Sequence, residues 1–170
     1  MPLVYLSLGS NIGKNMKDIA KNLAAACVFL EEKVGKIILK SKIYQTKAWG
    51  VQNQADFCNQ IILISTNLVP EMLLNVLLAI ELSLGRVRKV RWGERIIDID
   101  IIYFDDLIIN DTFGENLLII PHPRMQERLF VLVPLAEIAP YFVHPILKKT
   151  NKQLLSICND DLEVMIYDKI

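Results

Sequence analysis

The stretch IIDIDIIYF, residues 96–104, alternates apolar and acidic side chains and reads as a β-strand. In a strand, residues two apart lie on the same face, so the isoleucines at odd positions share one face. Asp98 and Asp100 share the other face, with their Cα atoms roughly 7 Å apart. The pattern therefore predicts a sheet with one face in the core and paired carboxylates on the other face.

The segments around this strand predict alternating strands and helices. In order, we expect a strand at 4–8, a helix from Asn15 as N-cap to about Leu30, strands at 37–46 and 57–66, and a helix from Pro70 to about residue 84. A turn at Asp105-Asp106 leads into LIIN (107–110), which we expect to pair back as a hairpin, and residues 124–138 contain a helical segment. This order predicts an α/β (α+β) ferredoxin-like sandwich, in which helices cover one face of a largely antiparallel sheet, plus a C-terminal extension.

The composition indicates one compact domain, residues 1–170. Hydrophobic residues make up 52% and charged residues 22%, which excludes a disordered protein. The 19 basic and 19 acidic residues cancel, which argues against a nucleic-acid or membrane-surface binder. Cys27, Cys58 and Cys158 are too far apart for a disulfide framework or a zinc site, and the N-terminus has no signal-peptide pattern. We therefore expect a cytoplasmic protein.

A cluster of basic residues comes directly before the carboxylate strand: Arg86, Arg88, Lys89, Arg91 and Arg95. Paired carboxylates on an apolar strand are costly unless cations neutralise them, and their hard oxygens suit Mg²⁺. Guanidinium groups match phosphate oxygens. Alone, the carboxylate pair is more often a solvated strand face, and the basic residues a solvated loop. Together they favour a metal–polyphosphate site, where Trp92 either packs on the ligand or anchors the loop.

Two further clusters have residue types suited to a ligand. Phe57 and Asn59 lie two apart on a predicted strand, so a ring and an amide share one face and could bind a flat heterocycle. A core role for Phe57 and a strand-end role for Asn59 are the alternatives. In PHPRMQERLF, residues 121–130, Arg124 and Arg128 are spaced for one face of a helix, which could equally be a solvated face.

The sequence resembles a known enzyme family. GRVRKVRWGERIIDIDIIYF (85–104), with LGSN (8–11) and PHPRMQERLFVLVPLAEIAP (121–140), is similar to the 6-hydroxymethyl-7,8-dihydropterin pyrophosphokinases of folate biosynthesis. The resemblance runs from the first strand to about Pro140, and the last thirty residues match little. It implies transfer of the β,γ-pyrophosphoryl group of ATP to the hydroxymethyl group of the pterin, with release of AMP.

Site residues follow from the resemblance by motif. It implies two Mg²⁺ ions held by Asp98 and Asp100, and catalytic roles for these residues and for Arg86 and Arg95. The implied ATP-binding residues are Glu81, Arg88, Arg91, Trp92, Ile101, His122 and Arg128. The implied pterin-binding residues are Thr46, Trp49, Phe57, Asn59 and Phe130. The partners are then the two substrates, with no nucleic acid and no membrane, and we expect a monomer able to associate with other folate-pathway enzymes.

Two other functions share parts of this pattern. A nucleotidyltransferase also uses paired aspartates and Mg²⁺, but it attacks the α-phosphorus and releases pyrophosphate. A ferredoxin-like RNA-binding module would use the basic loop as its contact surface, but the zero net charge and the lack of the basic–aromatic–glycine signature count against it. The identity of the released product separates the two enzymes.

Overall fold

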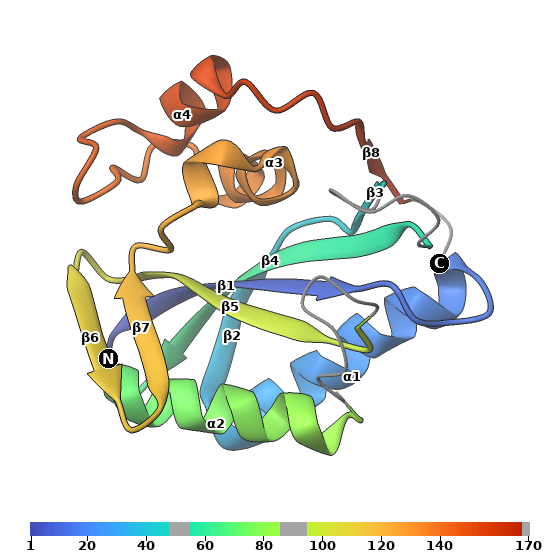
Figure 1. Cartoon of the computed structure of the whole chain (residues 1–170), viewed down its shortest axis with the longest axis horizontal. Coiled ribbons are helices and arrows are strands. Elements are labelled where there is room, and N and C mark those ends of the chain that lie inside the picture. The colour runs from blue at the N-terminus through green and yellow to red at the C-terminus, as the bar shows by residue number, and fades with distance from the viewer. Residues whose placement is uncertain (48–54, 86–94, 168–170) are drawn as a thin grey trace.

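The computed structural model describes residues 1–47, 55–85 and 95–167. A twisted sheet lies between two helical layers, and a separate hairpin stands at one end (Figure 1). The elements are β1 (Leu3–Ser10), α1 (Met16–Lys33), β2 (Gly35–Lys40), β3 (Tyr44–Thr46), β4 (Phe57–Thr66), α2 (Pro70–Ser83), β5 (Asp98–Phe104), β6 (Ile109–Phe113), β7 (Asn116–Ile120), the 3₁₀ turn η1 (Met125–Glu127), α3 (Leu129–Ile138), α4 (Asn151–Ile157) and β8 (Val164–Ile166).

The main sheet has the strand order β5-β1-β4-β3-β8, and β2 also pairs with β4 beyond the end of β3. Every strand pair described in it is antiparallel. The succession β1-α1-β2-β4-α2-β5 is the βαββαβ arrangement that the sequence predicted. The carboxylate strand β5 lies at one edge of this sheet, beside β1.

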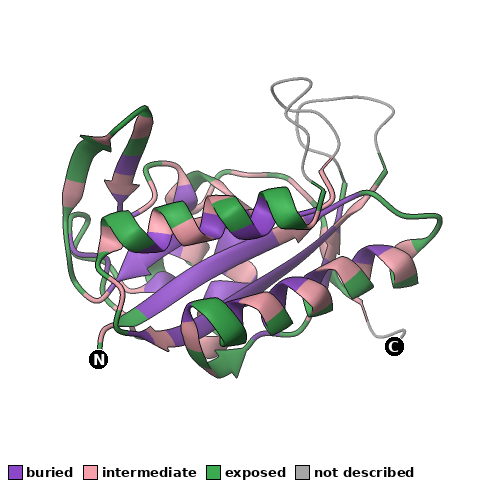
Figure 2. Ribbon diagram, turned by 90° about the horizontal axis from the view of Figure 1, so that it is seen from below, coloured by how far each residue is buried: buried purple, intermediate pink, exposed green. Residues whose placement is uncertain are grey.

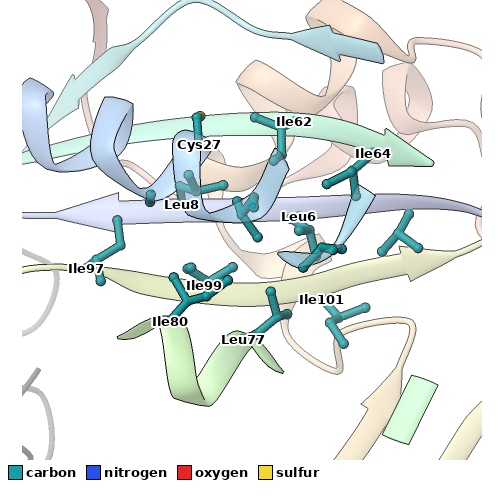
Figure 3. Close-up of a cluster of buried hydrophobic side chains, with 14 of the residues drawn as sticks. Leu6, Leu8, Cys27, Ile62, Ile64, Leu77, Ile80, Ile97, Ile99 and Ile101 are labelled. Carbon is teal, nitrogen blue, oxygen red and sulfur yellow. The ribbon is translucent and has the colours of Figure 1, made fainter. Parts of the chain in front are cut away.

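One face of the sheet packs against α1 and α2. Leu6, Leu8 and Ile99 contribute to a buried apolar cluster there, together with Leu23 of α1 and Leu77 of α2. Figure 3 shows Leu6, Leu8, Ile99 and Leu77 between the strands and the helices, and Figure 2 shows both helices burying one stripe and exposing the other. The apolar alternation of each strand accounts for this face.

The opposite face packs against α3 and α4 (Figure 1). It has a second cluster, which includes Tyr5, Ile61 and Tyr103 from the sheet and Leu132 from α3. The sequence analysis expected helices on one face only, and this second layer corrects it. The signal was weak because α3 is apolar all round and contains Pro134.

The ends of the first two helices follow the predicted signals. The Asn15 side chain accepts a hydrogen bond from Asp18 N at 3.0 Å and caps α1, and Pro70 is the first residue of α2. Gly85 follows α2 with a φ of 92°, a conformation that favours glycine. None of the helices in the described ranges has both the length and the apolar character needed to cross a bilayer.

The structure differs from the sequence prediction in one strand and in one hairpin. Residues 37–46 form two strands instead of one, because Ser41 breaks the ladder: its Oγ accepts a hydrogen bond from Ile61 N at 3.0 Å. LIIN does not pair back on the carboxylate strand. Its second half lies in β6, which pairs with β7.

Candidate active site

Three neighbouring strands place an amide, a glycine and a carboxylate in one row across the sheet. In the pairing register, Gly9 of β1 lies opposite Asn59 of β4 on one side and opposite Asp98 of β5 on the other. Opposed residues of antiparallel strands share a face, and neighbouring strands are about 4.8 Å apart. The amide and the carboxylate therefore flank a residue without a side chain, on the face that also carries α3.

The carboxylate pair lies on β5 as predicted. Asp98 and Asp100 are half-buried and alternate with buried isoleucines that pack toward α2. Arg95 forms an ion pair and hydrogen bond with Asp98, and both side chains remain partly accessible. Arg95, which is the residue of the predicted basic cluster that lies within the described ranges, thus contacts one carboxylate of the acidic pair.

Asp100 lies in a poor environment for a negative charge. Burial, and then the neighbouring Asp98 carboxylate, raises the pKa of Asp100 to about 7, although Arg128 and Arg95 act in the opposite direction. A further cation close to the pair would remove this cost. Hard carboxylate oxygens of this kind fit Mg²⁺, so the donor set suits the predicted metal.

The free edge of β5 is covered by polar contacts that explain why it forms no hairpin with 107–110. The buried Glu81 of α2 accepts a hydrogen bond from Ile99 N at 2.7 Å. On the same strand, Ile102 O accepts one from His122 N at 3.0 Å. Ile101 packs in the core on the α2 side of the sheet, so a nucleotide contact by this residue would come from its backbone.

His122 is neutral near pH 7. Burial, reinforced by the Arg128 guanidinium, lowers its pKa to about 4. Its Nδ1 accepts a hydrogen bond from Arg124 N at 3.2 Å, which leaves the ring proton on Nε2. His122 therefore supplies a neutral N–H donor at the edge of the carboxylate strand.

Arg128 lies near Asp100, but not on a helix face shared with Arg124 as we predicted. Residues 125–127 form a single 3₁₀ turn, and Arg128 is an extended residue that precedes α3. The two arginines therefore lie on either side of this turn and share no helix face. Arg128 Nε is buried with no hydrogen-bond partner within the described ranges, so the site holds a donor suited to an anionic ligand.

The predicted pterin residues come from β3, β4 and α3. Asn59 Nδ2 donates to Thr46 Oγ1 at 2.8 Å, and both side chains are buried. Phe57 is paired in register with Thr46, and Phe130 is the second residue of α3, packed on the second core. Thr46 thus occupies one N–H of Asn59, and the amide retains a second N–H and its carbonyl for a ligand.

Asn11 is a site residue to which the sequence analysis gave no role. It is buried and exchanges two backbone-directed hydrogen bonds with Arg95: its Oδ1 accepts from Arg95 N at 2.8 Å, and its N donates to Arg95 O at 3.1 Å. Its Nδ2 also donates to Ala55 O at 3.5 Å. The available signal in the sequence was its place directly after the first strand, because an amide that is buried at a strand end needs partners.

Several predicted site residues lie outside the residues that the structure describes. They are Trp49 on the pterin side, and Arg86, Arg88, Arg91 and Trp92 in the basic loop. Their roles stay predictions.

Comparison with known proteins identifies a family. The model of the family described as 7,8-dihydro-6-hydroxymethylpterin-pyrophosphokinase (HPPK) matches residues 5–140. A 2-amino-4-hydroxy-6-hydroxymethyldihydropteridine pyrophosphokinase of Aquifex aeolicus is 40% identical over 153 residues, which cover 90% of each chain. The enzyme of the same name from Methylorubrum extorquens is 45% identical over 144 residues, covering 84% of this chain and 86% of that protein.

Solved structures share the fold. A crystal structure of a Plasmodium falciparum HPPK-DHPS variant superposes with a TM-score of 0.74 at 19% sequence identity. The match covers 91% of this chain and 45% of the other, so this chain corresponds to less than half of that protein. The described fold is thus the one found in HPPK-DHPS structures.

Proposed function

The chain belongs to the 7,8-dihydro-6-hydroxymethylpterin-pyrophosphokinase family, and we propose that the Asn59–Gly9–Asp98 row is where its two substrates react. The family activity is ATP-dependent transfer of pyrophosphate to the hydroxymethyl group of the dihydropterin in folate biosynthesis. The observation that supports the proposed site is the register itself, because the Asn59 amide and the Asp98 carboxylate lie on one face, one strand away from Gly9 on either side.

On the β5 side of the row we place the triphosphate. Arg95 and Arg128 hold phosphate oxygens, and the buried Nε of Arg128 supports this role. His122 adds a neutral donor that does not repel a cation. The undescribed arginines at 86, 88 and 91 belong to the same set by their place in the sequence.

Asp98 and Asp100 are the residues that would hold Mg²⁺. When bound there, Mg²⁺ neutralises charge on the phosphates and on the two carboxylates. The raised pKa of Asp100 supports this assignment, because a cation at this place removes the cost of its ionisation. Glu81 keeps the strand in register through Ile99 N, so the two carboxylates stay on one face.

On the β4 side of the row we place the pterin. Asn59 presents an amide to the donor–acceptor edge of the heterocycle, and Thr46 fixes the orientation of that amide. Phe57 and Phe130 offer aromatic rings, and stacking on each is worth about 1 kcal/mol beyond area burial. Gly9 leaves the space between the two substrates free of side chains.

The reaction forms a bond from the pterin hydroxymethyl oxygen to the β-phosphorus of ATP. The bond between the β-phosphorus and the oxygen that bridges it to the α-phosphorus breaks, and AMP leaves with the electron pair of that bond. The proton of the hydroxyl group passes to solvent. A loose transition state of this type needs little help from a base and depends on alignment and charge neutralisation. In this proposal the row aligns the hydroxyl oxygen with the β-phosphorus, and the cationic side chains neutralise the negative charge of the phosphates.

The test is the identity of the products. The full chain incubated with Mg²⁺-ATP and 6-hydroxymethyl-7,8-dihydropterin should release AMP in a one-to-one ratio with the pterin diphosphate, separated by chromatography. Without the pterin, AMP release should fall to background. Release of pyrophosphate instead of AMP would show a nucleotidyltransferase and would contradict the proposal.

We extend the proposal to one class of partner, the other enzymes of the pathway. Solved structures that share this fold carry HPPK and DHPS in a single chain, and this chain corresponds to about 43% of such a protein. Co-sedimentation of the full chain with the DHPS protein of the same cell is the measurement. Independent sedimentation at micromolar concentration would contradict a stable complex.

A further inference from the structure

The C-terminal tail, which we define as residues 158–167, reaches the proposed pterin site from two directions. Its strand β8 pairs with β3, and Val164 lies in register with Thr46. Tyr167 N also donates to Ile43 O at 2.8 Å, just before β3. Figure 1 shows the tail crossing from α4 past α3 to the β3 edge of the sheet. The family model matches residues 5–140, so this tail lies outside the matched part of the chain.

Asp160 links the tail to the start of α3. Its Oδ2 accepts a hydrogen bond from Leu129 N at 2.9 Å, and its Oδ1 accepts one from Leu162 N at 3.1 Å. Arg128, the N-cap residue of α3, provides no side-chain cap, so the carboxylate from 31 residues away takes that place. The next residue of the helix is Phe130.

The tail meets this region both by packing and by a polar contact, and Cys158 and Phe130 pack against the same apolar cluster. A cavity of about 620 Å³ is lined both by Gln126 and Glu127 of η1 and by tail residues 158–161. Beside this cavity, the Asp160–Leu129 hydrogen bond is a direct polar contact between the tail and the segment that carries Arg128 and Phe130. Losing it would free the start of α3 to shift toward the cavity.

We propose that Asp160 is a positioning residue for the pterin site, which it serves by holding Phe130 through the N-terminus of α3 while β8 holds Thr46. The inference rests on the proposed function, because it takes Thr46 and Phe130 as pterin contacts. It assigns the tail a role in substrate affinity as well as in closing the fold.

The test compares two ligands in matched variants of the full chain. Calorimetry measures the Kd of 6-hydroxymethylpterin and, separately, of Mg²⁺-α,β-methylene-ATP. Asp160→Ala should raise the pterin Kd about threefold to tenfold, since only part of a lost charge-assisted hydrogen bond reaches the ligand. The nucleotide Kd should rise less than the pterin Kd, because Arg128 borders Leu129 but the other proposed phosphate and metal contacts lie on or next to β5. Asp160→Asn, which keeps one acceptor oxygen, should fall between Asp160→Ala and the unchanged chain.

The control and a double variant separate positioning from general loosening. Asp161→Ala removes an exposed neighbouring carboxylate that also lines the cavity, and it should leave both Kd values unchanged. If Asp160 acts through Phe130, Asp160→Ala should have almost no further effect on the pterin Kd in a Phe130→Ala background. An equal loss for both ligands, or an undiminished effect in that background, would overturn the proposal.

The failure of this inference is distinguishable from the failure of the site. If Phe130→Ala weakens the pterin but Asp160→Ala does not, the site stands and the role of Asp160 is refuted. If Phe130→Ala leaves the pterin Kd unchanged, the pterin pocket is misplaced and the inference falls with it.

Discussion

The two faces of the sheet differ in what their side chains do. The face toward α1 and α2 is lined by Leu6, Leu8 and Ile99, all buried and apolar. The face toward α3 begins with an apolar cluster around Tyr103 and then changes, along the same strands, to the row that contains Asn59 and Asp98. Successive residues of a strand point to opposite faces of the sheet, so each strand can carry core residues on one face and site residues on the other.

This division teaches that stability and chemistry should respond to different substitutions. A change on the α1–α2 face should alter the free energy of unfolding and leave catalysis almost unchanged. A change in the row should do the opposite. The predictions below test that separation, beginning with the largest effect.

Asp100→Asn should lower kcat by about two to three orders of magnitude, since it removes a charged ligand that would hold the charge-neutralising Mg²⁺ while it keeps the side-chain volume. Asp98→Asn should behave alike. AMP release under saturating substrates is the measurement, with native circular dichroism as the control. A near-normal rate in either folded variant would refute the assignment of that carboxylate.

Leu23→Ala tests the other face. Leu23 of α1 is fully buried, and truncating such a leucine costs about 2–5 kcal/mol through lost burial and the cavity left behind. Urea denaturation should show this loss, while kcat/KM at 20 °C should stay within about twofold because the row is on the opposite face. A tenfold fall in kcat/KM would show that the two faces are coupled.

Asn59→Ala should weaken pterin binding about tenfold, because the edge of the heterocycle then loses a buried hydrogen-bonding partner at roughly 1–3 kcal/mol. Binding of the ATP analogue should change little, since its proposed contacts lie on β5 and before α3. Calorimetric titration of each ligand gives both values. Equal weakening of the two ligands would place Asn59 outside a pterin-specific pocket.

The smallest expected effect is a pH dependence on the α3 side of the sheet, away from the row. Burial lowers the pKa of His144 below 6.5, and its Nδ1 accepts hydrogen bonds from Ile146 N and Leu147 N. The unfolded chain therefore binds this proton more readily than the folded chain, so stability is complete above about pH 6.5 and falls as the pH decreases below it.

His144→Asn keeps an acceptor oxygen and removes the titration. Urea denaturation at pH 7.5 and at pH 5.5 should show a smaller loss of stability on acidification in this variant than in the unchanged chain. An identical loss in both would assign the pH dependence to other groups, His122 among them.

Local patterns in the sequence predicted the α1–α2 face well. Strand β4 has the predicted limits, 57–66, and Asn15 and Pro70 start their helices as expected. The side-by-side placement of Asp98 and Asp100 followed from strand periodicity alone. These features depend on neighbours in the chain, so a sequence pattern carries them.

The α3 side depends on contacts between distant residues, and there the predictions were less complete. The predicted helix face shared by Arg124 and Arg128 was wrong because a single 3₁₀ turn lies between them and Arg128 is extended. The pairing of β8 with β3, and the partners of Asn11, join segments far apart in the chain, and a three-residue strand has no periodic signal of its own. The predicted roles of most site residues came from the family resemblance, because periodicity carries no information about a ligand.

Gly9 has a consequence for how this gene changes over generations. Every amino-acid substitution there adds at least a Cβ, and the folded protein tolerates it, because that atom would meet Asn59 Oδ1 at an ordinary 3.5 Å. The cost of a larger residue would fall on the reaction between the two substrates, with little burden on folding. In organisms that no longer need to make folate, we therefore expect Gly9 to be substituted earlier than the residues of the core. A larger residue at this position would then indicate that the enzyme is no longer used.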